Sequence, residues 1–187
     1  MAASSADRAR LIEIIKLRSV TVGTVFKLAS GRTSDFYCNL KPTMLHPEGA
    51  HLIGKLIAEA VAGSGAEMVG GLEMGAVPLA TATAAASHAR GTPLPAFFVR
   101  KQAKEHGTQS LIEGLPRGES LEGRRVVILE DVTTTGGSSL KAIKAVEAAG
   151  AKVIEVITVV DRQEGAAEAF EEAGVAFAAL ITARELR

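Results

Sequence analysis

The chain lacks most features of secreted, membrane and nucleic-acid-binding proteins. It has a single cysteine, Cys38, in 187 residues, which excludes an intrachain disulfide and is consistent with a reducing compartment. Lys and Arg together number 21, as do Asp and Glu, so the formal net charge is zero and no global field attracts nucleic acid or an anionic membrane. Any anion site must therefore arise from local clustering of charge.

Targeting signals are also missing. No window reaches the roughly 18 uninterrupted apolar residues that a membrane span needs, so no membrane association is expected. The segment Met1–Arg10 carries charges but no apolar run, so it does not resemble a signal peptide. We expect a cytoplasmic protein.

Two common phosphate-binding motifs are absent. No G-x-x-x-x-G-K-[ST] sequence occurs, and Gly63–Gly65 lacks the third glycine of a dinucleotide fingerprint and precedes a strand instead of following one. No metal-ligand spacing is present either, because the four histidines are scattered: His46, His51, His88 and His106. The residues alone therefore predict no metal site built by the protein.

Strand-like and helix-like runs alternate from residue 66 onward. The expected strands are Glu67–Gly71, Ala96–Arg100, Arg125–Glu130, Val153–Asp161 and Val175–Thr182. The expected helices are Val77–Ala89, Ser138–Ala149 and Ala166–Ala173. This alternation predicts an α/β fold with a mostly parallel central sheet flanked by helices on both faces.

The first part of the chain is more irregular. Helices are expected over Arg8–Arg18 and Pro47–Ala62, where Pro47 suits the first helical position, and short extended segments are expected over Phe26–Leu45. A second irregular interval, Lys101–Arg124, is glycine-rich and weakly periodic, which is typical of a functional lid or a disordered segment. With no linker and no internal repeat, residues 1–187 are predicted to form one domain.

The most informative segment is Val126–Ser139. It begins as a buried strand, ends in the acids Glu130 and Asp131, and passes through a Thr- and Gly-rich turn into a helix. Backbone N–H groups and a helix N-terminus suit a phosphate, and the carboxylates can accept hydrogen bonds from ribose hydroxyls. The segment therefore predicts a site for a phosphorylated sugar, although an ordinary strand-to-helix turn is the alternative.

A basic cluster opens the long loop. Arg100–Gly107 holds four potentially cationic side chains, which could pair with a polyanion such as pyrophosphate and close over the reacting centre. A solvated surface turn is the alternative.

Arg162 directly follows the expected strand Val153–Asp161. It could bind a substrate carboxylate or could form a surface ion pair with Glu164. Glu73–Pro78 is a second glycine turn that could contact a diphosphate.

Together these segments resemble the type I phosphoribosyltransferases, whose signature for 5-phosphoribosyl 1-diphosphate (PRPP) is an apolar strand, two acids and a Thr/Gly-rich turn. Within that group the chain looks like an orotate phosphoribosyltransferase, because the Arg-Lys-x-x-Lys-x-His-Gly sequence of the basic cluster is specific to the orotate enzymes. The further matching segments are Phe98–Gly107, Asp161–Glu164, Ser30–Arg32 and Phe36–Asn39.

The resemblance implies a fold with an N-terminal helix and small hood over residues 1–45 and a long mobile lid loop over 101–124. It implies transfer of the 5-phosphoribosyl group from PRPP to orotate, giving orotidine 5′-monophosphate and pyrophosphate in pyrimidine biosynthesis. It also implies Mg²⁺ carried mainly by PRPP, and a homodimer in which Lys101 acts in the neighbouring site.

The resemblance also implies residue roles. Lys104, His106 and Asp131 would be catalytic, and Thr134 and Arg162 would bind orotate. The residues expected to bind PRPP are Arg100, Lys101, Lys104, His106, Glu130, Asp131, Val132, Thr133, Thr134, Thr135, Gly136, Gly137 and Ser138. Two departures stand out, since many bacterial members carry lysine where this chain has Ala29 and Gly75, and backbone amides around Met74–Ala76 are the expected substitute.

Two other functions fit part of the pattern. A purine-base phosphoribosyltransferase would share the Glu130–Ser138 turn without calling for Arg162 or the basic cluster. A non-catalytic PRPP-sensing regulator would keep the fold, although an intact basic lid would then be unnecessary.

Overall fold

The computed structural model describes residues 2–27, 33–102 and 110–187. Its helices are α1 (Ala2–Arg18), α2 (Lys41–Met44), α3 (Pro47–Ala60), α4 (Ala76–Ala89), α5 (Gly137–Ala148), α6 (Ala166–Glu172) and α7 (Ala183–Leu186). Its strands are β1 (Val20–Lys27), β2 (Thr33–Cys38), β3 (Met68–Gly70), β4 (Phe98–Val99), β5 (Ile112–Glu113), β6 (Arg125–Thr133), β7 (Lys152–Asp161) and β8 (Ala176–Thr182). None of the helices in these ranges is both long and apolar enough to cross a membrane.

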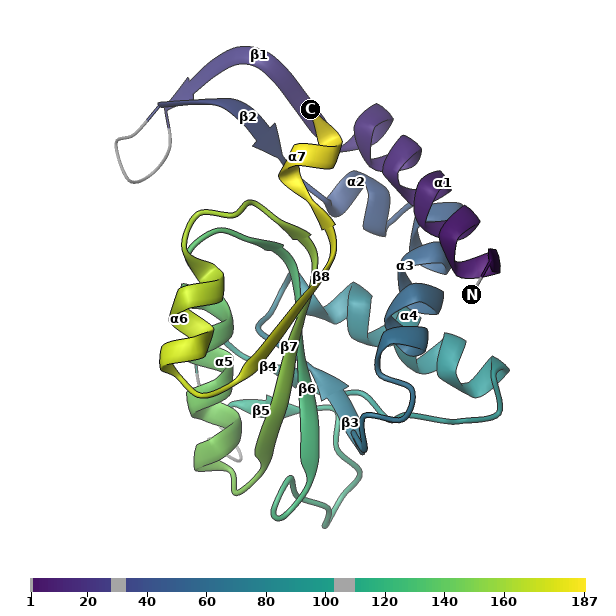
Figure 1. Ribbon diagram of the computed structural model, residues 1–187. Helices are drawn as coiled ribbons and strands as arrows, with labels where there is room; N and C mark the ends of the chain where they lie inside the picture. The colour runs from purple at the N-terminus through teal and green to yellow at the C-terminus, as the bar shows by residue number, and fades with distance from the viewer. Residues whose placement is uncertain (1, 28–32, 103–109) are drawn as a thin grey trace.

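The central sheet has the strand order β3-β6-β7-β8, and all its pairs are parallel. Strands β6 and β7 are nearly continuous apolar runs because helices cover both of their faces. Helices α5 and α6 lie on one face, and α1, α3 and α4 lie on the other (Figure 1). The prediction of a parallel sheet between two helical layers is confirmed.

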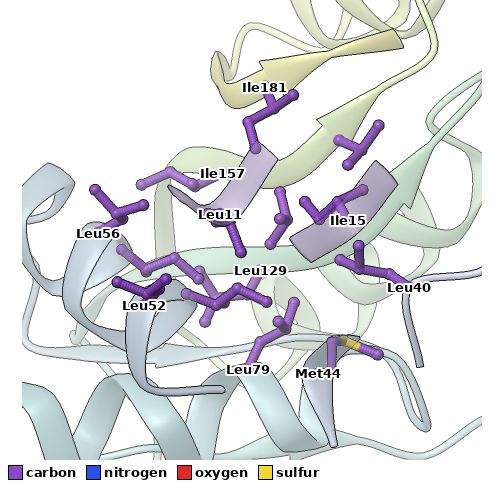
Figure 2. Packing of buried hydrophobic residues seen from close by; sticks show 14 of the residues in the cluster. Leu11, Ile15, Leu40, Met44, Leu52, Leu56, Leu79, Leu129, Ile157 and Ile181 are labelled. Atoms are coloured by element: carbon purple, nitrogen blue, oxygen red, sulfur yellow. The ribbon is translucent and has the colours of Figure 1, made fainter. Parts of the chain in front are cut away.

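The larger core cluster joins α1 and α3 to the sheet. Leu11 and Ile15 of α1 and Leu52 and Leu56 of α3 lie close to Leu129 and Ile157 of the central strands (Figure 2). The second cluster joins the sheet to α5 and α6, with Phe170 fully buried in it. Each face of the sheet therefore has its own apolar layer.

The helix after residue 46 begins where the sequence predicts. Pro47 occupies the first turn of α3, and the His46 side chain caps it by accepting a hydrogen bond from the Gly49 N–H at 3.5 Å. The helix ends at Ala60, two residues before the expected boundary. Helices α4, α5 and α6 also match their expected boundaries to within one residue.

The N-terminal hood is an antiparallel hairpin of β1 and β2, separate from the central sheet. It lies above the carboxyl ends of the parallel strands, next to α7 (Figure 1). The prediction of extended segments over Phe26–Leu45 is correct for β2 but wrong for Lys41–Met44, which form α2. Pro42 in the first turn of α2 has a fixed φ that suits a helix start, which explains the difference. Residues 28–32, including Ser30–Arg32, lie outside the described ranges.

The interval predicted as one long loop is partly structured. Strand β5 pairs antiparallel with β4, with Phe98 opposite Glu113, and Leu121 is fully buried in the second core cluster. The expected strand Ala96–Arg100 is correspondingly shorter, because only Phe98–Val99 form ladder pairs. Residues 103–109, which include Lys104 and His106, lie outside the described ranges.

The core predicts a large stability difference between two leucine variants. Leu129 is fully buried beneath α3 and α4, so Leu129→Ala should lower the free energy of unfolding by about 2–5 kcal/mol through lost burial and an unfilled cavity. Leu17 is 83% exposed, so the control Leu17→Ala should change it by no more than about 0.5 kcal/mol. Urea unfolding followed by circular dichroism measures both, and equal losses would contradict this assignment of the core.

Candidate active site

A pocket of about 330 Å³ opens at the carboxyl ends of β3 and β6. Its lining residues come from α2, the β3–α4 connection, the segment after β4, the end of β6 and the start of α5. They are Lys41, Leu72, Glu73, Met74, Gly75, Lys101, Glu130, Asp131 and Ser138. Ligands of open α/β sheets bind beyond this edge of the strands, so the pocket lies where the fold favours a site.

The acidic pair ends strand β6 inside this pocket. Glu130 is only 7% exposed, and its Oε2 accepts a hydrogen bond of 2.8 Å from the hydroxyl of Ser139 on α5. Burial raises the pKa of Glu130 to about 7, the Ser139 hydrogen bond opposes this shift, and the neighbouring Asp131 charge adds to it. The two acids therefore differ: Glu130 is held inside the protein, and Asp131 is half-buried.

Asp131 lies against the backbone of a glycine, Gly75. A Cβ atom added to Gly75 would lie 2.5 Å from Asp131 Oδ1 and 2.8 Å from its Cγ. The φ of Gly75 is −58°, an ordinary helical value, so the backbone would accept a side chain here and the contact with the carboxylate is what opposes one.

The turn after the acids is shaped by Gly136. Its φ of +80° is left-handed, and an added Cβ would lie 3.0 Å from the buried Phe170 ring, so both geometry and space favour glycine. The turn exposes Thr135, Gly137 and Ser138 to solvent. It leads directly into α5, so its outer surface combines free hydroxyls with a helix N-terminus, as the sequence predicts for a phosphate site.

Two other residues of the predicted turn point elsewhere. Val132 packs against the larger core cluster, and Thr133 is 2% exposed, with a buried hydroxyl that has no hydrogen-bond partner. The Thr133 carbonyl accepts a hydrogen bond of 2.9 Å from the Arg162 N–H, which ties β6 to the end of β7. Neither side chain lines the pocket, so any ligand contact of this pair would be made through the backbone.

The base of the predicted lid is fixed to the pocket wall. The Lys101 N–H donates to Glu73 Oε1 at 2.8 Å, the Arg100 N–H donates to the Leu111 carbonyl at 2.8 Å, and Arg100 forms a 3.7 Å ion pair with Glu113. Lys101 also lines a second hollow of about 500 Å³ that adjoins the first, together with Arg100 and Lys141. The structure thus brings Lys101 into the pocket of the acidic pair and Arg100 into the adjoining hollow.

Arg162 lies under the hood. Its side chain is 8% exposed, it forms a 2.6 Å ion pair with Glu164, and its guanidinium lies 5.6 Å from the centre of the Phe36 ring. The ion pair with Glu164, which the sequence offers as the alternative role of Arg162, is therefore present, but the guanidinium in it is buried. Burial raises the pKa of the nearby Cys38 thiol to about 12; the Asp131 charge adds to this shift and Arg162 opposes it, so Cys38 of β2 lies near both groups.

Sequence reasoning missed two residues of the pocket region. Lys41 lines the pocket from α2, and Ser139 holds Glu130 from behind it. Ser139 is visible in the sequence as the last hydroxyl of the acidic stretch, nine residues after Glu130. Lys41 carries no such signal, because only the folding of the hood brings α2 to this edge.

A parallel sheet, an acidic strand end, a glycine turn into a helix and an N-terminal hood together define the type I phosphoribosyltransferase fold. The comparisons agree. Residues 43–175 match the family model described as the phosphoribosyl transferase domain. The chain is 60% identical over 181 residues to the orotate phosphoribosyltransferase of Bradyrhizobium sp. (strain ORS 278), covering 97% of each protein.

Solved structures give the same result. The Mycobacterium tuberculosis H37Rv orotate phosphoribosyltransferase in complex with Fe(III) dicitrate has a TM-score of 0.83 and 44% identity, over 96% of this chain and 98% of that one. The same enzyme in complex with PRPP has a TM-score of 0.80 and 40% identity, also over 96% and 98% of the two chains. The chain belongs to the orotate phosphoribosyltransferase family.

The contact between Gly75 and Asp131 predicts the effect of a single methyl group. Gly75→Ala should push the Asp131 carboxylate out of place and lower kcat/KM for PRPP by about 10- to 100-fold, because misplacement by an ångström has effects of this size. Thermal stability should change little, since the backbone at residue 75 is helical. Steady-state kinetics and thermal melting measure the two quantities.

A double-mutant comparison separates this cause from others. In an Asp131→Ala background, Gly75→Ala should have almost no further effect on kcat/KM, because the group that it displaces is gone. A full additional loss would show that Gly75 acts through something other than Asp131.

Proposed function

We propose that this pocket transfers the 5-phosphoribosyl group from PRPP to orotate, giving orotidine 5′-monophosphate and pyrophosphate in pyrimidine biosynthesis. One observation carries the proposal: a single pocket joins the acidic pair and the start of α5 to the cationic base of the lid. A sugar phosphate and its diphosphate would thus find complementary groups in one pocket. Such chemistry uses phosphorylated substrates that do not cross membranes, which favours a cytoplasmic location.

The ribose and its 5′-phosphate would lie along the end of β6. Glu130 and Asp131 would accept hydrogen bonds from the ribose hydroxyls, with Asp131 the more exposed of the two. The turn from Thr133 to Ser138 would surround the 5′-phosphate with backbone N–H groups, the hydroxyls of Thr135 and Ser138, and the N-terminus of α5. Val132 contributes here through the main chain only.

The pyrophosphate would be bound by Arg100, Lys101, Lys104 and His106. Departure of this group ahead of attack by orotate N1 builds positive charge on the ribose, so the main requirement is stabilisation of the leaving group. Lys104 and His106 would supply it as the lid closes and excludes water. Asp131, fixed against Gly75, would hold the ribose in line for attack.

Orotate would lie between the hood and the end of β7. Its carboxylate suits the buried guanidinium of Arg162, which it would reach by joining or displacing Glu164. Phe36 supports the other side of that guanidinium, and Thr134 would fix the ring from the phosphate turn. A purine base has no carboxylate for Arg162, so this residue favours orotate over the purine alternative.

Magnesium would enter with PRPP. Mg²⁺ keeps several waters and is typically bound by substrate phosphates with few protein ligands. In ranges 2–27, 33–102 and 110–187, no three His, Cys, Asp or Glu side chains lie together as a ligand cluster. The ion would be held mainly by the oxygens of PRPP itself, where it would neutralise the charge of the departing pyrophosphate.

A homodimer would complete the site. Helix α4 contains no Asp, Glu, Lys or Arg, and it begins beside Met74, which is 62% exposed at the rim of the pocket. An uncharged helix that reaches the rim suits contact with a second copy of the chain. Lys101, at the same rim, would then act in the neighbouring site.

The reaction predicts a direct assay. The ultraviolet absorbance of orotate should fall when protein, PRPP and Mg²⁺ are all present, and omission of PRPP or Mg²⁺ should stop the change. Adenine and hypoxanthine should give no nucleotide product, because neither has a carboxylate for Arg162. PRPP binding without pyrophosphate release would instead support the regulator alternative.

Sharing of Lys101 between subunits predicts complementation. Lys101→Ala and Asp131→Ala should each be inactive alone, but after subunit exchange half of the dimers should be mixed, each with one working site. About one quarter of the wild-type activity should therefore return. Two differently tagged variants and native mass spectrometry verify the exchange.

A matched pair serves as the control for complementation. Glu130→Ala and Asp131→Ala lie on the same strand of the same subunit, so their mixed dimers should regain no activity. Sharing is refuted if the first pair exchanges subunits and also regains none.

A further inference from the structure

We propose that Ser139 is a positioning residue: its hydroxyl fixes the Glu130 carboxylate as a hydrogen-bond acceptor for the ribose of PRPP. The inference rests on the proposed function, because it assigns a role to a residue behind the same pocket. Ser139 does not itself line that pocket. It would act on the substrate only through Glu130.

The geometry of the pair is well defined. Glu130 is at the end of β6, Ser139 is in the first turn of α5, and the donor Oγ lies 2.8 Å from Glu130 Oε2. Ser139 is 1% exposed and Glu130 is 7% exposed, so water competes little for this hydrogen bond. A hydroxyl that is buried in the first turn of a helix and donates to a carboxylate of the site differs from Thr135 and Ser138, which face solvent.

Glu130 needs such a donor because of its burial. Burial favours the protonated acid and raises the pKa of Glu130 to about 7, and the Ser139 hydrogen bond lowers that pKa by stabilising the charged form. The N-terminus of α5 acts in the same direction as the hydroxyl. Without these two groups the side chain would be neutral over more of the physiological pH range and would be a weaker acceptor for a ribose hydroxyl.

The other charged groups around Glu130 do not replace Ser139. Glu73, Lys41 and Lys101 line the same pocket, and Asp131 is adjacent on β6. Thr158 is opposite Glu130 on β7 and is neutral. Its hydroxyl donates a hydrogen bond to the Val160 carbonyl and not to Glu130. Ser139 therefore supplies a neutral donor that does not itself titrate, so the group whose ionisation changes with pH is Glu130.

The placement also links two parts of the substrate. The helix turn that holds Glu130 through Ser139 is continuous with the turn proposed for the 5′-phosphate. A phosphate bound at the start of α5 and a ribose hydroxyl bound by Glu130 would thus rest on one rigid element. Binding of the phosphate would then place the ribose hydroxyl in position for its hydrogen bond to Glu130.

The test is the pH dependence of kcat/KM for PRPP in Ser139→Ala. Ionised Glu130 is the competent form, so activity should fall as the pH drops through its pKa. Removing the hydroxyl raises that pKa further, and the acidic limb should move upward by about one pH unit. Activity relative to wild type should drop about tenfold at low pH and should be close to normal above pH 9. PRPP is the same in every assay, so titration of its phosphates cancels.

Three variants identify the cause. Ser139→Thr keeps a hydroxyl and should return the limb toward its original position. Ser87→Ala removes another buried hydroxyl, far from the pocket in α4, and should leave the limb unchanged even if it lowers stability. In a Glu130→Gln background, Ser139→Ala should cause no shift, because the titrating group is absent.

The outcomes separate this inference from the proposed function. A wild-type protein that consumes no orotate overturns the proposed function. A wild-type protein that is active, with a Ser139→Ala limb that does not move or with a loss that is equal at every pH, overturns only the role of Ser139.

Discussion

The site depends on one constraint, which is that a carboxylate must remain usable where a buried parallel strand ends. Strand β6 is covered on both faces, so its last residues leave an apolar layer and meet the pocket with little water around them. A charged group in that place is costly unless donors surround it. The strand-to-helix connection supplies them, because α5 starts only four residues after β6 ends and folds its first turn back onto Glu130. The position of Glu130 and the shape of the turn from Thr133 to Ser138 therefore both result from one tight connection.

Three glycines allow close contacts of the backbone around the acidic pair. An added Cβ would lie 2.3 Å from the Leu129 carbonyl at Gly71, 2.5 Å from Asp131 at Gly75 and 3.0 Å from Phe170 at Gly136. Gly71 and Gly75 lie on the β3–α4 connection, and Gly136 lies on the turn between β6 and α5. Because these three residues have no side chain, the two segments can approach their neighbours closely. At Gly75 the pocket wall is backbone, and the cations that line the same pocket are Lys41 and Lys101.

The sequence best predicted the elements whose apolar residues follow a regular helix or strand period. The ends of α4, α5 and α6 came within one residue, and the acidic turn was located from residues alone, because it combines a buried strand, two acids and glycines. The strands β4 and β5 were harder, since two-residue pairs carry no periodic signal. The sequence predicts an extended segment where α2 forms. It gives no sign of the contact between Ser139 and Glu130, because that contact is fixed by how α5 packs on β6. Tertiary packing, which no local pattern encodes, decided these cases.

The surroundings of Arg162 are built differently from the acidic turn. The acidic pair and the turn after it belong to one continuous segment, β6 to α5, whereas Arg162 is held by pieces from distant parts of the chain. The Phe36 ring of the hood lies against its guanidinium, Glu164 pairs with it, and Arg187 at the C-terminus contacts the same Phe36 ring at 5.3 Å. This arrangement forms only when hood, sheet and C-terminus have assembled, so it uses parts of the chain that lie outside the β6–α5 segment. Under the proposed function, a fold of this kind can keep one sugar-phosphate donor and change its acceptor base by altering the hood and the end of β7.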